Sequence, residues 1–219
     1  MSTIAILPIK SFDDSKQRLA PALSAGPRRA LAEAMFADVL VALRRAQSVD
    51  EMVVVSSAHI AQRIAGGHGA SVIEDHASGH SEAAALGIAH AIESRAQRVL
   101  LVPGDCPLLD PAEIDALIAH PIGPRSALIV PDRHGTGTNA LLLTPPDSLT
   151  PSFGPGSCTR HYDLARAQGA TPEVVEVASL ALDVDTPEDF EALRETLAGS
   201  RGRAAHTRGM LSQLTRSQH

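Results

Sequence analysis

Residues 98–110 read RVLLVPGDCPLLD, and this stretch decides the fold class. An uninterrupted apolar run of this kind fits a β-strand that is buried on both faces, as the strands of parallel sheets are. The run stops at a Pro-Gly-Asp turn, which places Asp105 just after the carboxyl end of the strand. In open α/β sheets, ligands bind beyond the carboxyl ends of the strands. The stretch therefore predicts a parallel sheet with a carboxylate at its ligand-binding edge.

Apolar strand patterns alternate with helical patterns on both sides of this stretch. We expect strands at 3–7, 52–56, 70–74, 98–102, 127–130, 140–143 and 173–177, and helices at 27–46, 59–64, 81–94, 111–120, 160–167 and 187–197. Strands separated by helices form βαβ crossovers, so the predicted class is α/β with a mostly parallel central sheet flanked by helices. Ser81, Asp110 and Thr186 are the expected caps of the helices that follow them.

No domain boundary or internal repeat interrupts residues 1–198, which we interpret as a single domain. Residues 199–219 gain four Arg and lose apolar periodicity. A segment of this composition lacks the apolar face needed to dock on a core, so we expect a disordered or loosely attached tail.

The composition argues against several classes of protein. A net charge of −6 does not suit a protein that coats nucleic acid or an anionic membrane, and an aromatic content of 2% does not suit base stacking. No apolar run approaches the roughly 20 residues of a membrane span, and the first residues lack the pattern of a signal peptide. Two cysteines are too few for a disulfide framework. We therefore expect a cytoplasmic protein that binds neither nucleic acid nor membranes.

The loop that follows the first strand holds both lysines of the chain, whose other 17 basic residues are all arginines. Lys10 and Lys16 lie close to Arg18 in this loop. A lysine ammonium approaches phosphate as a point charge, so a basic loop at the carboxyl end of a strand suits a triphosphate. The loop lacks the glycine patterns of a P-loop and of a dinucleotide fold. A solvated surface loop, with the lysines clustered by chance, is the alternative.

Three carboxylates are candidates for a cation site. Asp105 follows a strand, and Asp183 and Asp185 stand two apart in the segment LDVDTPED at 182–189. If this segment is extended, Asp183 and Asp185 point the same way. Mg²⁺ commonly takes one or two carboxylates together with substrate phosphates. The alternatives are a plain turn at Asp105 and a structural role for the later pair.

Two glycine-rich segments are candidates for binding an anion. PDRHGTGTN at 131–139 links two apolar strands, and FGPGSCT at 153–159 precedes a helix. Backbone N–H groups and hydroxyls in such loops bind phosphate or carboxylate, so the pair could hold a small acidic substrate. The alternatives are an ordinary hairpin for the first segment and helix capping by Ser157 for the second.

Taken in order, these segments resemble the guanylyltransferases of coenzyme F-420 biosynthesis, the CofC and FbiD family. The resemblance covers about residues 4–197 and rests on LPIKxxxxSKxRLxP, PGDCPLL, PDxxGTGTN, FGxGS and DVDTPEDF. The PGD and DxDTPED patterns are shared with the wider nucleotidyltransferase superfamily, including the molybdenum-cofactor enzymes. GTGTN followed by FGPGS is typical of CofC and FbiD.

The resemblance implies a single-domain Rossmann-like, GT-A-like nucleotidyltransferase fold. It implies transfer of GMP from GTP to phosphoenolpyruvate, 2-phospho-L-lactate or 3-phospho-D-glycerate, with release of pyrophosphate. The implied residues are Asp105 and Asp185 as ligands of Mg²⁺, Lys16 and Arg18 as catalytic residues near the triphosphate, Leu7, Pro8, Lys10, Gly79 and Ser81 as nucleotide contacts, and Thr138, Gly154 and Ser157 as contacts of the acid. The segment GHSE at 79–82 stands where superfamily relatives often carry a Gly-Leu-Asn-like segment. The acceptor acid, the residues that read guanine and the oligomeric state, a homodimer included, stay open.

Two other functions fit parts of the sequence. One is a different enzyme of the same superfamily, which would act on a pterin, a sugar phosphate or a sugar nucleotide; the GTGTN and FGPGS segments disfavour it. The other is a non-catalytic nucleotide-sensing module. Retention of both Asp105 and Asp185 argues against a sensor, and pyrophosphate release separates it from the enzymes.

Overall fold

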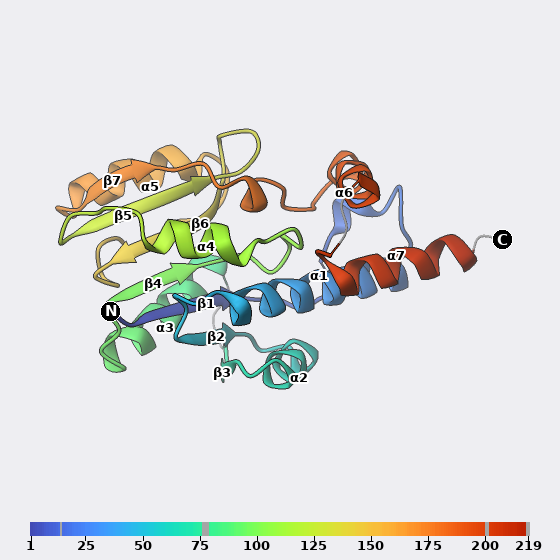
Figure 1. The fold of residues 1–219 in the computed structure, drawn as a ribbon, viewed down its shortest axis with the longest axis horizontal. Helices are drawn as coiled ribbons and strands as arrows, with labels where there is room; N and C mark the ends of the chain where they lie inside the picture. Colours follow the sequence, from blue (N-terminus) through green and yellow to red (C-terminus); the bar gives the residue numbers. More distant parts are fainter. Residues whose placement is uncertain (14, 76–78, 200–201, 218–219) are drawn as a thin grey trace.

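A seven-stranded sheet forms the centre of the computed structural model, which describes residues 1–13, 15–75, 79–199 and 202–217 (Figure 1). In spatial order its strands are β3 (Ser71–Ile73), β2 (Glu51–Val55), β1 (Thr3–Pro8), β4 (Arg98–Leu101), β6 (Thr138–Thr144), β5 (Ser126–Pro131) and β7 (Thr171–Val174). Strand β6 runs antiparallel to both of its neighbours, and the other pairs are parallel. The predicted α/β class with a mostly parallel sheet is confirmed.

Helices cover both faces of this sheet (Figure 1). They are α1 (Ala25–Arg45), α2 (His59–Gly67), α3 (His80–Glu93), α4 (Pro111–Ile118), α5 (Ser157–Ala167), α6 (Pro187–Gly199) and α7 (Ala205–Ser217), with 3-10 turns η1 (Gln17–Leu19) and η2 (Ala178–Leu180). Helices α1, α2 and α4 share one apolar cluster with the sheet, and α3 and α5 share the other. Because side chains alternate along a strand, Leu7 of β1 enters the first cluster and Ile6 enters the second.

The strand order creates a crevice between β1 and β4. β1 pairs with β2 on one side and with β4 on the other: the chain moves outward from β1 to β2 and β3, and then returns past β1 to β4, so the strand order reverses at β1. In doubly wound sheets, ligands bind at such a switch point, beyond the carboxyl ends of the strands. The loop with Lys10 and Lys16 follows β1, and the turn with Asp105 follows β4. The fold therefore brings the predicted basic loop and the predicted carboxylate to one edge.

The predicted helix caps are confirmed at two of three positions. The Asp110 carboxylate accepts the backbone N–H of Ala112 at 2.9 Å, and the Thr186 hydroxyl accepts that of Asp189 at 3.2 Å. The prediction for Ser81 is wrong. Helix α3 begins one residue earlier, with Gly79 in the cap position, and the Ser81 hydroxyl instead accepts the backbone N–H of Phe153 at 3.0 Å.

The expected tail is a helix, so the prediction of a disordered segment beyond residue 198 is wrong. Residues 200–201 and 218–219 lie outside the described part, but α7 packs along α1. The buried Asp38 carboxylate on α1 accepts the backbone N–H groups of His206 at 3.0 Å and Thr207 at 2.8 Å, which caps α7. Met210 is buried in a third apolar cluster, which also contains Leu31 and Met35 of α1. The apolar face by which α7 packs on the protein is short, and its cap, Asp38, is far away in the sequence. Composition alone therefore did not reveal this helix.

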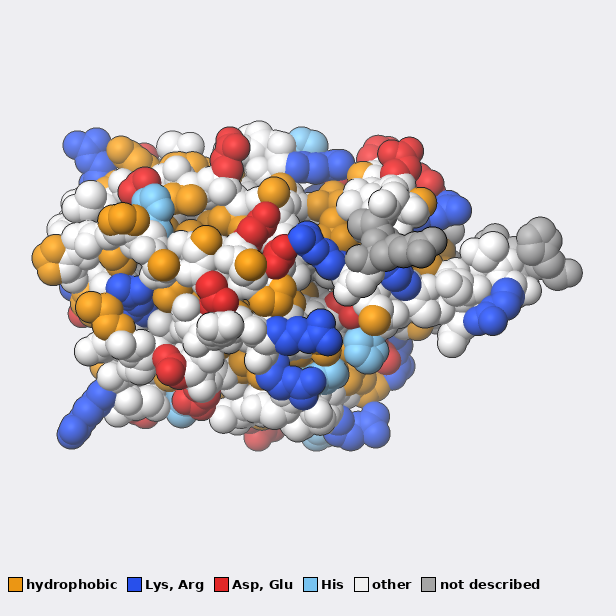
Figure 2. Space-filling view, in the orientation of Figure 1, with side chains coloured by type: hydrophobic (Ala, Val, Ile, Leu, Met, Phe, Trp, Pro, Cys, Tyr) orange, Lys and Arg blue, Asp and Glu red, His pale blue; other side chains and the backbone are white. Residues whose placement is uncertain are grey.

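Helix α7 projects beyond the body of the protein toward the C-terminus (Figure 1). On the face drawn in Figure 2, apolar side chains are scattered among acidic and basic ones. Within the described ranges, no helix combines the length and the apolar character that crossing a membrane requires.

Candidate active site

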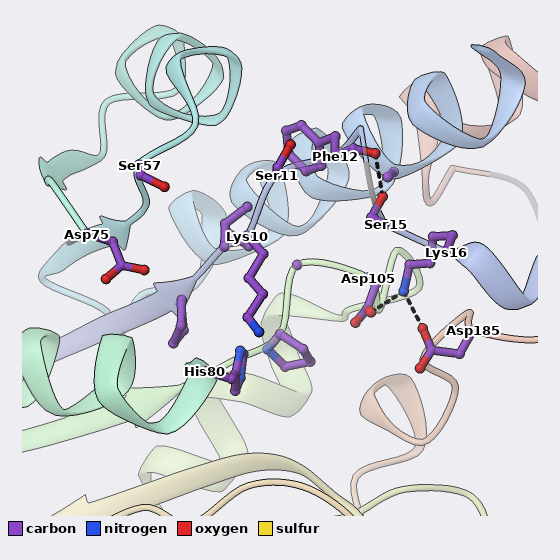
Figure 3. Close-up of a pocket in the computed structure, with 15 residues that line it drawn as sticks. Lys10, Ser11, Phe12, Ser15, Lys16, Ser57, Asp75, His80, Asp105 and Asp185 are labelled. Carbon is purple, nitrogen blue, oxygen red and sulfur yellow. Dashed lines mark hydrogen bonds and ion pairs between the residues drawn. The ribbon is translucent and has the colours of Figure 1, made fainter. Parts of the chain in front are cut away.

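A cavity of about 660 Å³ opens at the carboxyl ends of β1 and β4 (Figure 3). Its lining includes residues 8–12 at and after the end of β1, Ser15 and Lys16 farther along the same loop, and the turn at Gly104 and Asp105 after β4. Volumes of about 300–1,000 Å³ are typical of small-molecule sites. Gly104 fits closely here, because a Cβ at this position would lie 2.5 Å from Cδ1 of Ile9 and 3.2 Å from the Phe36 ring, so the Ile9 side chain would have to shift. The absence of a side chain lets the two loops approach each other.

Lys16 joins the two carboxylates that the sequence singles out. Its Nζ donates to Oδ2 of Asp105 and, at 2.7 Å, to Oδ1 of Asp185 (Figure 3). Lys16 has a φ of 56°, a left-handed backbone conformation that non-glycine residues adopt at a cost. The two ion pairs hold it there. Three segments far apart in the sequence thus meet at one point.

The Lys16 ammonium is a buried charge balanced by its partners. Its side chain is 7% exposed, against 26% for Asp105 and 48% for Asp185. Burial by itself lowers the pKa of Lys16, but the nearby charges of Asp105 and Asp185 outweigh burial and raise this pKa above its usual value. Lys16 therefore stays protonated throughout the physiological pH range and is paired here with two carboxylates.

The loop that carries Asp185 is held by Asp189 in the first turn of α6. The Asp189 carboxylate accepts the backbone N–H groups of Asp185 at 3.1 Å and Thr186 at 2.7 Å. Arg133, in the loop between β5 and β6, forms an ion pair with the Asp189 carboxylate at an N–O distance of 2.5 Å. Burial raises the pKa of Asp189, but the hydrogen bonds from Thr186 and the Asp185 backbone lower it overall. Asp189 is therefore an ionised anchor for Asp185.

Asp183 has a different partner from Asp185. Its Oδ1 accepts a hydrogen bond from the Asn139 side chain at 3.1 Å, and the same amide donates to the Leu180 carbonyl at 2.7 Å. Burial, followed by the charge of Asp105, raises the pKa of Asp183. Asp183 thus links the GTGTN segment to the acidic edge, whereas Asp185 faces Lys16.

A divalent cation site explains the geometry of Asp105 and Asp185 better than a plain turn at Asp105 does. Oδ1 of Asp105 is buried and has no hydrogen-bond partner among the described residues. A buried oxygen left without a donor is costly, and a metal ion would satisfy it. Within the same part of the chain there is no group of three or more His, Cys, Asp or Glu side chains placed to hold a metal. Two carboxylates completed by substrate phosphates are nevertheless a common arrangement for Mg²⁺.

The opposite end of the cavity contains residues that the sequence reasoning missed. Ser57, Asp75 and His80 line it there, with Lys10 between them and the acidic pair (Figure 3). Burial lowers the pKa of His80; the charge of Asp105 opposes this effect and the charge of Lys10 adds to it. The pKa is lowered overall, so this imidazole is neutral near pH 7. Ser57 and Asp75 each follow a strand at its carboxyl end, and the rule that singled out Asp105 could have found them.

Arg18, which was implied as a catalytic residue, and several of the residues implied as nucleotide contacts do not line this cavity. Leu7 is fully buried in the core, and Arg18 lies exposed on η1. Gly79 caps α3, and Ser81 contacts the backbone of Phe153. Of this group, Pro8 and Lys10 do line the cavity. The contacts implied for the other four residues gain no support from the cavity.

The residues implied to hold the acid lie outside the cavity lining but come together near it. The Cys158 N–H donates to the Thr136 carbonyl at 3.1 Å, which joins the FGPGS segment to the GTGTN segment. Gly154 has a φ of 115°, which L-amino acids rarely adopt. Gly156 occupies the cap position of α5, so helix capping by Ser157 is excluded. The Ser157 N–H donates to the Gly154 carbonyl at 3.1 Å, so this N–H is used within the loop, and the residue is 2% exposed.

The comparison with protein families agrees with this geometry. The family described as "Guanylyl transferase CofC like" matches residues 3–216, nearly the whole chain. The chain belongs to the CofC family of guanylyl transferases. It is accordingly a nucleotidyltransferase, and the resemblance drawn from its motifs is confirmed.

Similar proteins are named as guanylyltransferases of three different phosphorylated acids. A phosphoenolpyruvate guanylyltransferase of Conexibacter woesei is 56% identical over 219 residues, covering 99% of this chain and 98% of the relative. A 3-phospho-D-glycerate guanylyltransferase of Colwellia psychrerythraea is 33% identical, covering 88% and 91%. A 2-phospho-L-lactate guanylyltransferase of Methanothermobacter thermautotrophicus is 32% identical, covering 98% and 92%.

Solved structures of other transferases share the fold of this CofC protein. A nucleotidyl transferase of Methanothermobacter superposes with a TM-score of 0.65 at 16% identity, covering 91% of this chain and 99% of that one. A putative nucleotide-diphospho-sugar transferase of Desulfovibrio desulfuricans G20 superposes with a TM-score of 0.77 at 17% identity, covering 97% of this chain and 95% of that one. At this identity the likeness shows the fold and leaves the substrate unassigned. The predicted nucleotidyltransferase fold is therefore confirmed.

Proposed function

We propose that this CofC protein transfers GMP from GTP to a small phosphorylated three-carbon acid and releases pyrophosphate. The observation that carries the proposal is the meeting of Lys16, Asp105 and Asp185 at the edge of a cavity of nucleotide size. Because the relative at 56% identity is named for phosphoenolpyruvate, we propose that acid as the acceptor, ahead of 2-phospho-L-lactate and 3-phospho-D-glycerate.

The reaction is a displacement at phosphorus. A phosphate oxygen of the acid attacks the α-phosphorus of GTP, and the bond from this phosphorus to the oxygen of the pyrophosphate leaving group breaks. A phosphate monoester has a second pKa of about 6, so its nucleophilic oxygen is already ionised near pH 7. The step needs no general base, and catalysis consists of positioning and charge neutralisation. A lysine between carboxylates suits this chemistry.

The residues of the crevice divide this task. Lys10 and Lys16 would donate to triphosphate oxygens from the loop after β1. Asp105 and Asp185 would hold Mg²⁺, which supplies neutralisation of charge on the phosphates when it is bound. Asp189 keeps the Asp185 backbone in place for this role.

The glycine-rich loops would bind the acid beside the triphosphate. The hydroxyls of Thr138 and Ser157 are donors that suit a carboxylate or a phosphate. The backbone conformation at Gly154 shapes the loop that presents Ser157. We place the reaction in the cytoplasm, because GTP is available there and because Cys106 and Cys158 are both free thiols.

The test is pyrophosphate release from GTP and Mg²⁺ with each of the three acids in turn. We expect release with phosphoenolpyruvate, and none with pyruvate, which has no phosphate nucleophile. ATP and CTP are the control nucleotides and should be poor donors. Absence of release with every acid would refute transfer activity and leave a nucleotide-binding module. Equal release from CTP would refute guanylyl specificity.

A further inference from the structure

His161 is a buried histidine that contacts Thr138 and the loop preceding α5, next to the residues implied to bind the acid. It lies in the first half of α5 and is 0% exposed. Its Nδ1 lies 2.9 Å from the Thr138 hydroxyl on β6, and its Nε2 lies 2.9 Å from the backbone N of Ser152. The imidazole thus bridges Thr138 on β6 and the loop at Ser152.

The two contacts determine which nitrogen carries the proton. The Ser152 N–H can only donate, so Nε2 of His161 accepts and carries no hydrogen. Burial, and secondly the charge of Arg160, lower the pKa of His161 to about 4, so the ring is neutral near pH 7. A neutral imidazole with a bare Nε2 carries its hydrogen on Nδ1. Nδ1–H therefore donates to the Thr138 hydroxyl oxygen.

This donation fixes the direction of the Thr138 hydroxyl. A threonine hydroxyl that accepts from a neighbour still has its own hydrogen to donate. With His161 on one side of the oxygen, that hydrogen points away from His161. Thr138 is half-buried, so the residue is partly accessible from outside the core. The histidine converts a freely rotating hydroxyl into an oriented donor.

The surroundings of His161 keep the ring from moving. The Phe153 ring meets it edge-on with centroids 5.1 Å apart, and meets His80 of the cavity in the same way at 4.8 Å. Arg160 donates to the carbonyls of Ser152 and Pro155, each at 3.0 Å. The loop that supplies the N–H to Nε2 is therefore braced at several points, which preorganises the contact.

We propose that His161 is a positioning residue that orients the Thr138 hydroxyl to donate to the anionic acceptor acid. The proposal rests on the proposed function, in which Thr138 contacts the acid. His161 acts through Thr138 and does not touch the reacting atoms. A purely structural histidine would hold α5 and the 152–156 loop in place without affecting the acid more than GTP.

The two contacts of His161 can be separated by a pair of substitutions. His161→Asn places an amide N–H near the position of Nδ1, so it can still donate to Thr138 but loses the acceptor for Ser152. His161→Gln places its amide oxygen near the position of Nε2, so it keeps the acceptor and loses the donor to Thr138. The two variants are combined with Thr138→Val, which removes the hydroxyl at nearly constant shape.

Steady-state kinetics with phosphoenolpyruvate and GTP, together with melting temperatures, provide the readouts. We expect His161→Gln to raise the KM for the acid about five- to tenfold with little change for GTP, because a hydrogen bond to a charged ligand is weakened. His161→Asn should recover most of this loss. In the Thr138→Val background, His161→Gln should add less than about twofold, because coupled residues are not additive.

The outcomes distinguish failure of the inference from failure of the proposed contact. If Thr138→Val leaves the KM for the acid unchanged, the contact between Thr138 and the acid is wrong, and the role of His161 falls with it. If Thr138→Val raises that KM and His161→Gln does not, the contact stands and the inference is overturned. Equal rises for acid and GTP with a lower melting temperature, or full additivity in the double variant, would assign His161 to the fold alone.

Discussion

Replacing Asp105 by Asn tests the acidic edge most directly, because the change removes one charge and keeps the shape. Asp105 lies in the turn after β4, accepts from Lys16 through Oδ2, and has a buried Oδ1 without a partner among the described residues. The variant therefore loses both an ion pair and a candidate metal oxygen. We expect a folded protein with turnover reduced about 100- to 1,000-fold, or about 3–4 kcal/mol of transition-state stabilisation.

The effect on stability should be much smaller. Removing one partner of a fully buried ion pair costs about 3–5 kcal/mol. Here Asp185 still pairs with Lys16 at 2.7 Å, and Asp105 and Asp185 are 26% and 48% exposed, so solvent screens the loss. We expect about 1 kcal/mol, which lowers the melting temperature of a protein of this size by about 2–4 °C.

The assay is pyrophosphate release at saturating GTP, Mg²⁺ and phosphoenolpyruvate, with melting followed by circular dichroism. Asp163→Asn, which removes an exposed carboxylate from α5, is the matched control and should match the wild type in both measurements. A folded Asp105→Asn variant whose turnover stays within threefold of wild type would show that Asp105 is neither a metal ligand nor needed near the phosphates.

Three further predictions concern the supports of the site. Asp38→Ala removes the cap of α7 and should cost about 1–2 kcal/mol of stability, seen as a lower melting temperature and faster proteolysis within 202–217, with turnover unchanged; unaltered proteolysis would contradict the docking. Gly104→Ala brings a Cβ to 2.5 Å from Ile9, so it should destabilise by about 1–3 kcal/mol and slow turnover; a variant equal to wild type in both would contradict the tight approach. Because the folded-state pKa of His161 is depressed to about 4, the unfolded chain binds this proton first, and the stability that neutral His161 contributes is present above about pH 6.5 and lost between pH 6.5 and 4. The melting temperature of His161→Gln should fall less steeply over this range than that of wild type, and an equal slope would contradict it.

The local pattern was sufficient to predict the elements and part of the site. Apolar runs ending at Leu7 and Val102 predicted buried parallel strands, and the carboxyl-end rule then placed the basic loop and Asp105 at one edge. Boundaries shifted because they depend on tertiary contacts. The last strand lies at Thr171–Val174 rather than 173–177, since its position is set by pairing with β5.

The sequence also contained a signal in the tail that its composition concealed. Thr207, Met210, Leu211 and Leu214 have the i, i+3, i+4, i+7 spacing of a helix face, but arginines surround them. Whether so narrow a stripe docks depends on the surface opposite it. Only the folded chain presents the buried Asp38 carboxylate at the start of α7.

By itself the sequence determined the class of the fold, the family and the residue types at the edge of the cavity, because strand periodicity and motif order are properties of the linear chain. The tertiary structure alone decided which of these residues meet. Lys16 reaches Asp105 and Asp185 across 89 and 169 residues, and His161 reaches Thr138 across 23. Such pairings follow from strand order and loop packing. The spacing of residues along the chain does not predict these contacts. Each contact stabilises the protein only after the fold has brought both partners together.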